Sequence, residues 1–156
     1  MDFFEEEIIA FFNLLNKHEV KYVLVGGLAV NYHGFSRSTG DVDLWLEDSP
    51  VNRQKLVNGL KEREIEGCEA FLTYPLLAGF AEILLDNGIY IDLMSNLKSF
   101  SQDRFTECYQ LADDFEIIPG VKIKVMHINK LIEEKEKSNR EKDIEDAKQL
   151  KRLHKK

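Results

Sequence analysis

The chain has 156 residues and a formal net charge of -7, with 44% hydrophobic and 31% charged residues, a composition typical of globular proteins. An acidic chain argues against an extended nucleic-acid surface, because sequence-independent binding of phosphates needs a broad basic face. No apolar run is long enough for a membrane span, the acidic start lacks signal-peptide character, and Cys68 and Cys108 have no paired spacing, so we expect a cytoplasmic protein without disulfides.

Residues 3–17 have the spacing of an amphipathic helix. Its apolar positions recur at helical intervals and are Phe4, Ile8, Phe11, Phe12 and Leu15. Acidic residues in the first turn suit the positive end of the helix dipole. We expect this helix to pack on one face of a sheet that begins near Lys21.

Residues 22–47 read as a strand, a glycine turn, a short helix, a polar loop and a second strand. The apolar strand ends abruptly at Gly26 and Gly27. Two glycines let the backbone turn sharply and let a ligand approach the main chain. Leu28–Tyr32 is predicted to be helical, so a phosphate suits the place above the glycines, where helix N–H groups are free.

The second strand covers residues 41–46 and carries two acidic side chains. Because side chains alternate along a strand, Asp41 and Asp43 share one face and Val42 and Leu44 share the other. Paired carboxylates repel each other and are costly to bury, whereas Mg²⁺ is bound by one or two carboxylates together with phosphates and water. Trp45 lies on the carboxylate face, either as packing or as a platform for a base.

The Asp48-Ser49-Pro50 sequence predicts the start of a helix that runs to about Glu66 and ends at Gly67. Residues 68–80 contain several aromatic and aliphatic side chains and are interpreted as irregular core or as the rim of an active site. Asn87-Gly88 predicts a hairpin between strands 81–86 and 89–94. We expect this hairpin to place a third acid, Asp92, on a strand near the centre of the sheet, beside the strand that carries Asp41 and Asp43.

The remaining residues are predicted to form a helix over 101–111, a hairpin of strands 115–118 and 121–125 around Pro119-Gly120, and two closing helices over 127–137 and 140–153. The last helix has an apolar stripe of Ile144, Ala147, Leu150 and Leu153.

The ordered set of Val25-Gly26-Gly27, Asp41-x-Asp43 and Asp92 resembles the nucleotidyltransferase fold of the DNA polymerase β superfamily. The resemblance implies an α/β (α+β) fold with a mixed central β-sheet flanked by helices. It also implies a single domain over residues 1–156, with core motifs at about 20–95 and C-terminal closing helices at about 127–154.

A second resemblance lies at the C-terminal end, where Lys135 precedes Arg140-x-Lys142-Asp143-x-x-Asp146. This stretch is similar to the closing motif of AbiE-type bacterial nucleotidyltransferases, and Arg37-Ser38-Thr39 matches an element of the same group. The resemblance implies nucleotide binding by eight residues: Gly26, Gly27, Arg37, Ser38, Thr39, Lys135, Lys142 and Asp143. The alternative is a charged helix surface with pairs four residues apart.

These resemblances imply a metal-dependent transfer of a nucleoside monophosphate from an NTP, with ATP favoured, to a protein, small-molecule or RNA acceptor, with release of pyrophosphate. Asp41, Asp43 and Asp92 would be catalytic and would bind Mg²⁺ or Mn²⁺. Small relatives include antitoxins that modify a partner toxin, so a toxin–antitoxin setting is one expectation. The competing interpretation is a catalytically degenerate nucleotide- or partner-binding domain of the same fold.

Overall fold

The computed structural model describes residues 2–154, and its strands form one mixed sheet in the order β3-β4-β2-β1-β6-β5. The strands are β1 (Tyr22–Val25), β2 (Asp41–Leu46), β3 (Ala81–Leu84), β4 (Tyr90–Met94), β5 (Asp113–Ile118) and β6 (Val121–Val125). Strands β2 and β4 pair in parallel, as do β1 and β6, and the other neighbours are antiparallel. The predicted mixed architecture and both predicted hairpins are therefore confirmed; residues 1 and 155–156 of the predicted domain lie outside the described part.

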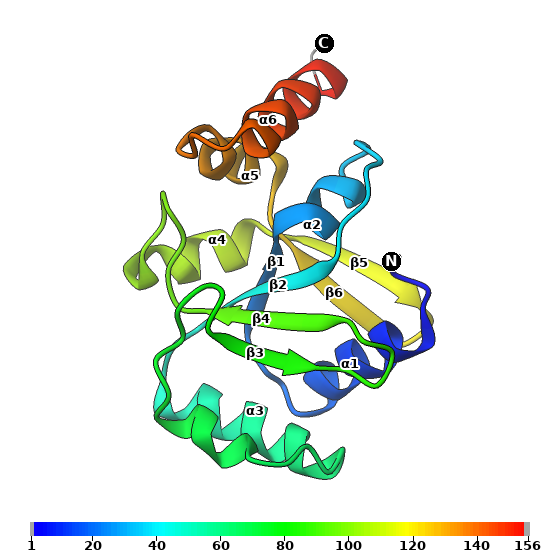
Figure 1. Cartoon of the computed structure of the whole chain (residues 1–156), viewed down its shortest axis with the longest axis vertical. Coiled ribbons are helices and arrows are strands. Elements are labelled where there is room, and N and C mark those ends of the chain that lie inside the picture. Colours follow the sequence, from blue (N-terminus) through cyan, green and yellow to red (C-terminus); the bar gives the residue numbers. More distant parts are fainter. Residues whose placement is uncertain (1, 155–156) are drawn as a thin grey trace.

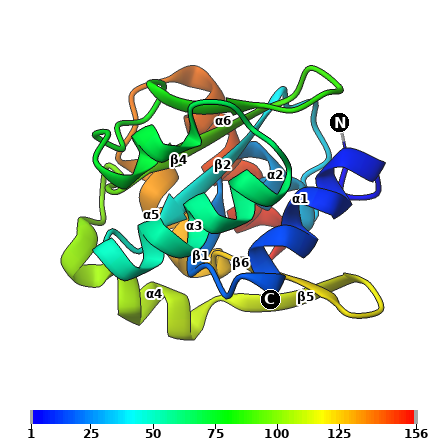
Figure 2. The ribbon, with the colours of Figure 1, turned by 90° about the horizontal axis from the view of Figure 1, so that it is seen from below.

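The helices are α1 (Glu6–Lys17), α2 (Gly26–Tyr32), α3 (Pro50–Glu62), α4 (Phe105–Leu111), α5 (Ile128–Glu136) and α6 (Glu141–Leu153), with short 3-10 turns η1 (Cys68–Leu72) and η2 (Gln102–Arg104). In Figure 1, α5 and α6 stand together next to α2 at one end, and α3 lies at the opposite end. Figure 2 shows α1 and α3 side by side, and Gly59 of α3 lies against Leu14 of α1. No helix within residues 2–154 is both long and apolar enough to cross a membrane.

The core includes Trp45, whose side chain lies on the same face of β2 as the carboxylates. Its ring is completely buried, with ring centroids 6.1 Å from Phe100 and 5.1 Å from Phe105. The indole Nε1 donates a hydrogen bond to the carbonyl oxygen of Ser95 at 2.7 Å, as a buried indole requires. Trp45 is therefore core packing, and its ring is not a platform for a base. Cys68 and Cys108 are free and buried, as expected.

Three details of the predicted helices were wrong. Phe4 is 64% exposed, because α1 begins only at Glu6 and Phe3 is buried instead. Ile144 and Leu153 are exposed, because the buried face of α6 includes the carboxylates of Asp143 and Asp146. Helix α3 ends at Glu62 rather than near Glu66, since Glu64 takes a left-handed φ of 56° that no helix continues.

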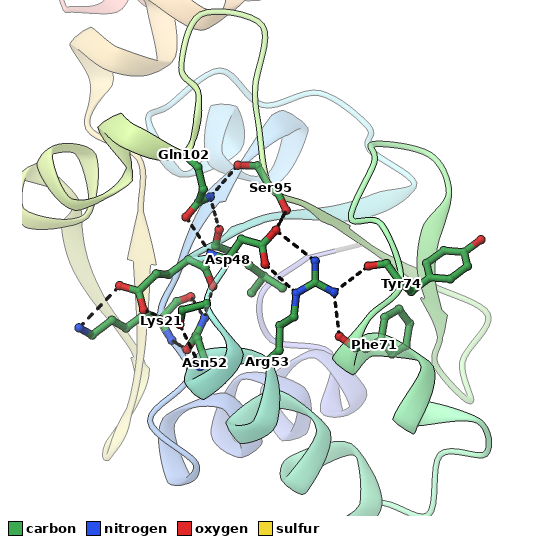
Figure 3. Close-up of polar contacts among 11 residues, drawn as sticks. Lys21, Asp48, Asn52, Arg53, Phe71, Tyr74, Ser95 and Gln102 are labelled. Carbon is green, nitrogen blue, oxygen red and sulfur yellow. Dashed lines mark hydrogen bonds and ion pairs between the residues drawn. The ribbon is translucent and has the colours of Figure 1, made fainter.

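The start of α3 anchors a neighbouring segment through a polar cluster (Figure 3). Ser49 caps the helix by accepting a hydrogen bond from the Asn52 backbone N–H at 3.1 Å, as predicted. Arg53 donates to both carboxylate oxygens of Asp48 at 2.6 and 3.1 Å, and to the carbonyl oxygens of Phe71 and Tyr74 at 3.1 and 2.7 Å. The guanidinium lowers the pKa of Asp48. This cluster fixes the chain just before residue 75.

Residues 75–80 form a turn that we call the 75–80 turn, and most of it is not core. Leu76 is buried and its carbonyl accepts a hydrogen bond from the Ser95 N–H at 3.0 Å. Leu77 and Phe80 are 55% and 71% exposed. The core interpretation of this stretch was therefore wrong for these two side chains, and the turn projects from the protein between two anchored ends.

Candidate active site

The glycine turn and the three predicted acids meet where β1, β2 and β4 lie side by side. Val25 at the end of β1 is opposite Asp43 of β2. Asp43 is in turn opposite Asp92 of β4, and Asp41 is opposite Tyr90. Parallel pairing keeps Asp43 and Asp92 on the same face of the sheet. The juxtaposition that the sequence predicted is thus present in the fold.

Gly26 and Gly27 are required by close approach. Gly26 has a left-handed φ of +70°, and a Cβ atom there would lie 2.0 Å from Oδ2 of Asp43. A Cβ atom on Gly27 would lie 2.5 Å from Oγ1 of Thr39. The Asp43 carboxylate therefore lies directly against the glycine backbone, and any side chain at residue 26 would displace it.

We expect Gly26→Ala to destabilise the protein more than Gly120→Ala and to disturb the site. Both glycines have a left-handed φ, which costs an alanine about 1–2 kcal/mol, but nothing lies within 4 Å of a Cβ atom on Gly120. The clash with Asp43 should therefore add roughly 2 kcal/mol, the usual scale for overpacking. Urea unfolding of both variants measures the difference, and equal losses would contradict the close packing of Asp43 on Gly26.

A cavity of about 320 Å³ opens beside these residues, a volume in the range of small-molecule sites. Its lining includes ten of the predicted residues: Gly26, Gly27, Arg37, Thr39, Asp41, Asp43, Asp92, Lys135, Lys142 and Asp143. Ser38 is exposed and does not line the cavity. Helices α5 and α6 thus bring the C-terminal motif over the glycine turn, as Figure 1 shows for the elements.

Two of the predicted cations are held by buried carboxylates. Arg37 donates from Nε and Nη2 to the two oxygens of Asp146, both at 2.7 Å. Lys135 Nζ lies 2.9 Å from Asp143 Oδ1 and 3.0 Å from Asp146 Oδ2. Asp146 is completely buried and joins both cations. This buried ionic network, made of Arg37, Lys135, Asp143 and Asp146, fastens the loop after α2 to α5 and α6.

The acids at the centre of the cavity are partly buried and repel one another. The pKa of Asp43 is raised from 3.8 to about 6, by burial first and then by the charges of Asp92 and Asp41. Burial also raises the pKa of Asp92, although its carboxylate oxygens both accept from the Gly79 N–H at 3.0 Å. A cation would relieve the repulsion that raises these pKa values.

The carboxylates suit a hard cation as a partial ligand set. No three His, Cys, Asp or Glu side chains within residues 2–154 are grouped so as to hold a metal ion by themselves. Magnesium in proteins commonly takes one or two carboxylates and completes its octahedral shell with water and substrate phosphates. Asp41 and Asp43 are the pair that this chain could supply.

The sequence interpretation missed several residues of the cavity. Lys98 and Glu134 line it, and the N–H groups of Lys98 and Ser99 donate to Glu134 at 2.9 and 2.7 Å. Nothing in the sequence around Lys98 indicates this contact, because it depends on how α5 packs. Arg140 also lines the cavity, and Asp146 is buried against Arg37 and Lys135. Both residues belong to the C-terminal motif, which was the sequence pattern that could have identified them.

The comparisons with known proteins agree with this geometry. A protein-family model described as "Nucleotidyl transferase of unknown function (DUF2204)" matches residues 4–156. A comparison with curated proteins finds no match.

Proposed function

This chain belongs to the DUF2204 family of nucleotidyl transferases, and we propose that it transfers a nucleoside monophosphate from an NTP, with ATP as first candidate, to an acceptor hydroxyl. In this reaction the acceptor oxygen forms a bond to the α-phosphorus. The bond from the α-phosphorus to the oxygen that bridges it to the β-phosphate breaks, and pyrophosphate leaves. The observation that carries the proposal is the pairing of Asp43 with Asp92 at the glycine turn, where the Asp43 carboxylate lies directly against Gly26.

Asp41 and Asp43 are the residues that would hold Mg²⁺ or Mn²⁺. When bound, such an ion neutralises charge on the phosphates and on the attacking oxygen. Asp92 lies beside Asp43 with a raised pKa, so its carboxylate is suited to accept the proton of the acceptor hydroxyl. A base with a pKa nearer to neutrality accepts such a proton more readily.

The phosphates of the NTP would lie between the glycine turn and the cations of the cavity. Lys142 is exposed at the cavity and forms no ion pair among residues 2–154, and we propose it as the main phosphate contact. Lys98 and Arg140 line the same cavity. Arg37 and Lys135 are bound to buried carboxylates, so we propose that they shape the phosphate site rather than neutralise the triphosphate alone.

A thermal-shift titration with each NTP, with and without Mg²⁺, tests this function. A ligand at about one hundred times its dissociation constant adds roughly 2.7 kcal/mol of stability. We expect a Mg²⁺-dependent shift for the wild type and none for Asp41→Asn/Asp43→Asn. The matched control is Glu64→Gln/Asp86→Asn, which changes the charge equally at two exposed residues outside the cavity.

The control should respond to NTP as the wild type does. If no NTP stabilises the wild type, the proposed transferase activity is contradicted, and a partner-binding domain of the same fold is the better interpretation. If the double aspartate variant responds as strongly as the wild type, Asp41 and Asp43 do not hold the cation.

A further inference from the structure

Strand β3 forms one edge of the sheet and leaves backbone groups unpaired. Leu85 N donates to Ile89 O at 2.8 Å, so the alternation of an antiparallel pair turns the backbone of Ile83 toward β4 and that of Glu82 and Leu84 outward. Within residues 2–154, neither outward N–H group donates to another element. The edge is therefore a template on which another strand could pair.

Some of the devices that block natural edge strands are absent from β3. Lysine, proline and bulges commonly block such edges; β3 is a short Ala-Glu-Ile-Leu strand that has none of these, and Glu82 is its one charged residue. The opposite edge strand, β5, has an irregularity between Glu116 and Ile118. The two edges thus differ, and β3 is the one left open for pairing.

An apolar groove of about 420 Å³ runs beside β3. Its lining is mostly apolar: Ile65, Gly67, Ala70, Phe71, Tyr74, Phe80, Ile83 and Leu84, with Glu66 and Glu82. Of the eleven large hydrophobic side chains exposed within residues 2–154, Leu77 and Phe80 belong to the 75–80 turn, Leu84 belongs to β3, and Tyr74 lies just before the turn. A concentration of this kind marks an interaction surface.

The negative charge of the groove indicates that its partner carries basic side chains. Its charged lining residues are Glu66 and Glu82, and it has no lysine, arginine or histidine. A complementary segment therefore alternates apolar side chains, which fill the groove, with basic side chains, which face the two carboxylates.

The groove and the catalytic cavity are joined by the 75–80 turn. Ala78 lines the cavity, Phe80 lines the groove, and Gly79 between them donates to Asp92. Glu82 of β3 is directly opposite Asp92 of β4. Because strands are spaced by about 4.8 Å, a strand added to β3 would pass about 10 Å from the backbone of Asp92.

We propose that β3 and its groove dock an extended basic and apolar segment of an acceptor protein, which adds as a strand and presents its hydroxyl residue to the cavity. The acceptor role rests on the proposed nucleotidyl transfer; the docking itself does not. The 75–80 turn, anchored by Arg53 before it (Figure 3) and by β3 after it, lies where such a segment would contact both sites.

The probe is a fluorescently labelled nine-residue peptide that alternates lysine with valine and phenylalanine. Fluorescence anisotropy measures its binding to the full chain, and hydrogen exchange reports the amides of Glu82 and Leu84. We expect binding by the wild type, protection of both amides, and at least a roughly tenfold loss for Phe80→Ser/Leu84→Ser, given the apolar area removed. The matched control, Phe4→Ser/Ile144→Ser, removes two exposed apolar side chains elsewhere and should bind as the wild type does.

A version of the peptide with glutamate in place of lysine should also bind at least roughly tenfold more weakly. The proposal is overturned if the lysine peptide does not bind, if it binds both double variants equally, or if the two amides stay unprotected. It is also overturned if sedimentation shows that a second copy occupies β3, as a dimer that Phe80→Ser/Leu84→Ser dissociates.

The Mg²⁺-dependent NTP shift, measured on the same variants, separates this proposal from the proposed function. Phe80→Ser/Leu84→Ser should keep the NTP shift, since neither side chain lines the catalytic cavity. A wild type that binds the peptide but shows no NTP shift would refute the transferase and leave a protein-docking edge. A wild type with the NTP shift but no peptide binding would refute the docking alone.

Discussion

We expect Asp43→Asn to abolish most nucleotidyl transfer and, in metal-free buffer at pH 8, to make the protein more stable. The loss of transfer should be on the order of 10³-fold, the scale on which a central electrostatic contact contributes to catalysis. The gain in stability follows from the position of Asp43, which lies against Gly26 and is surrounded by Asp41 and Asp92. Function and stability should therefore change in opposite directions at this residue.

The raised pKa of Asp43 determines how its contribution to the stability of the fold changes with pH. The pKa of Asp43 is raised from 3.8 to about 6 in the folded protein, so the folded state holds the proton more tightly than the unfolded state does. The stabilising contribution of the protonated carboxyl is complete below about pH 4 and is lost as the pH rises through 6. At 1.36 kcal/mol for each pKa unit, this loss is about 3 kcal/mol, and asparagine removes it.

Urea unfolding of wild type and Asp43→Asn at pH 4 and pH 8, with EDTA present, measures this effect. Asp86→Asn is the control, because Asp86 is exposed and outside the cavity. Pyrophosphate release from the NTP in the presence of acceptor measures transfer. A variant that is less stable than wild type at pH 8, or that still transfers at the wild-type rate, would refute the role given to Asp43.

The second large effect is expected for Asp146→Ala, with a loss of about 3–5 kcal/mol in the free energy of unfolding. Asp146 is completely buried and neutralises Arg37 and Lys135, whose side chains are 14% and 9% exposed. Removing one partner of a buried ionic network leaves the others buried without compensation, and this costs about that much. Asp146→Asn should cause a large part of the same loss in stability, because the amide keeps the shape of the side chain but not its charge.

The matched control is Glu136→Ala, which breaks the exposed ion pair of Glu136 with Lys151 between the same two helices. Exposed pairs contribute about 0–1 kcal/mol, so this variant should remain close to wild type. Thermal or urea unfolding of the three variants gives the comparison. Similar losses for Asp146→Ala and Glu136→Ala would mean that the buried ionic network does not hold α5 and α6 on the glycine turn.

The sequence predicted those parts of the fold that depend on local patterns. Alternation in residues 41–46 placed Asp41 and Asp43 on one face, and Asn87-Gly88 paired the strand of Asp92 with β3, because turn chemistry and strand period are local properties. Local patterns cannot identify the partner of a side chain. The bond between Arg37 and Asp146 joins residues 109 positions apart, and the contact of Gly79 with Asp92 joins the 75–80 turn to strand β4.

Periodicity likewise predicted helices but not every buried face. Ile144 fits the apolar stripe of the last helix, yet the side of α6 that faces α5 buries carboxylates because Lys135 lies opposite them. Phe80 is apolar and was assigned with its neighbours to the core or to the active-site rim, yet it lies on the surface beside a sheet edge. Phe80 is exposed because β3 takes the edge position in the sheet, and no local sequence pattern determines the order of the strands.

The pairing of β2 with β4 also has a consequence for the order of folding. Asp43 and Asp92 become neighbours only after the whole segment between them, including α3 and β3, has closed into a loop. Such non-local closure is entropically costly and slow. Because this closure is itself the slow step, the repulsion between the carboxylates is expected to act already in the transition state, where it slows folding.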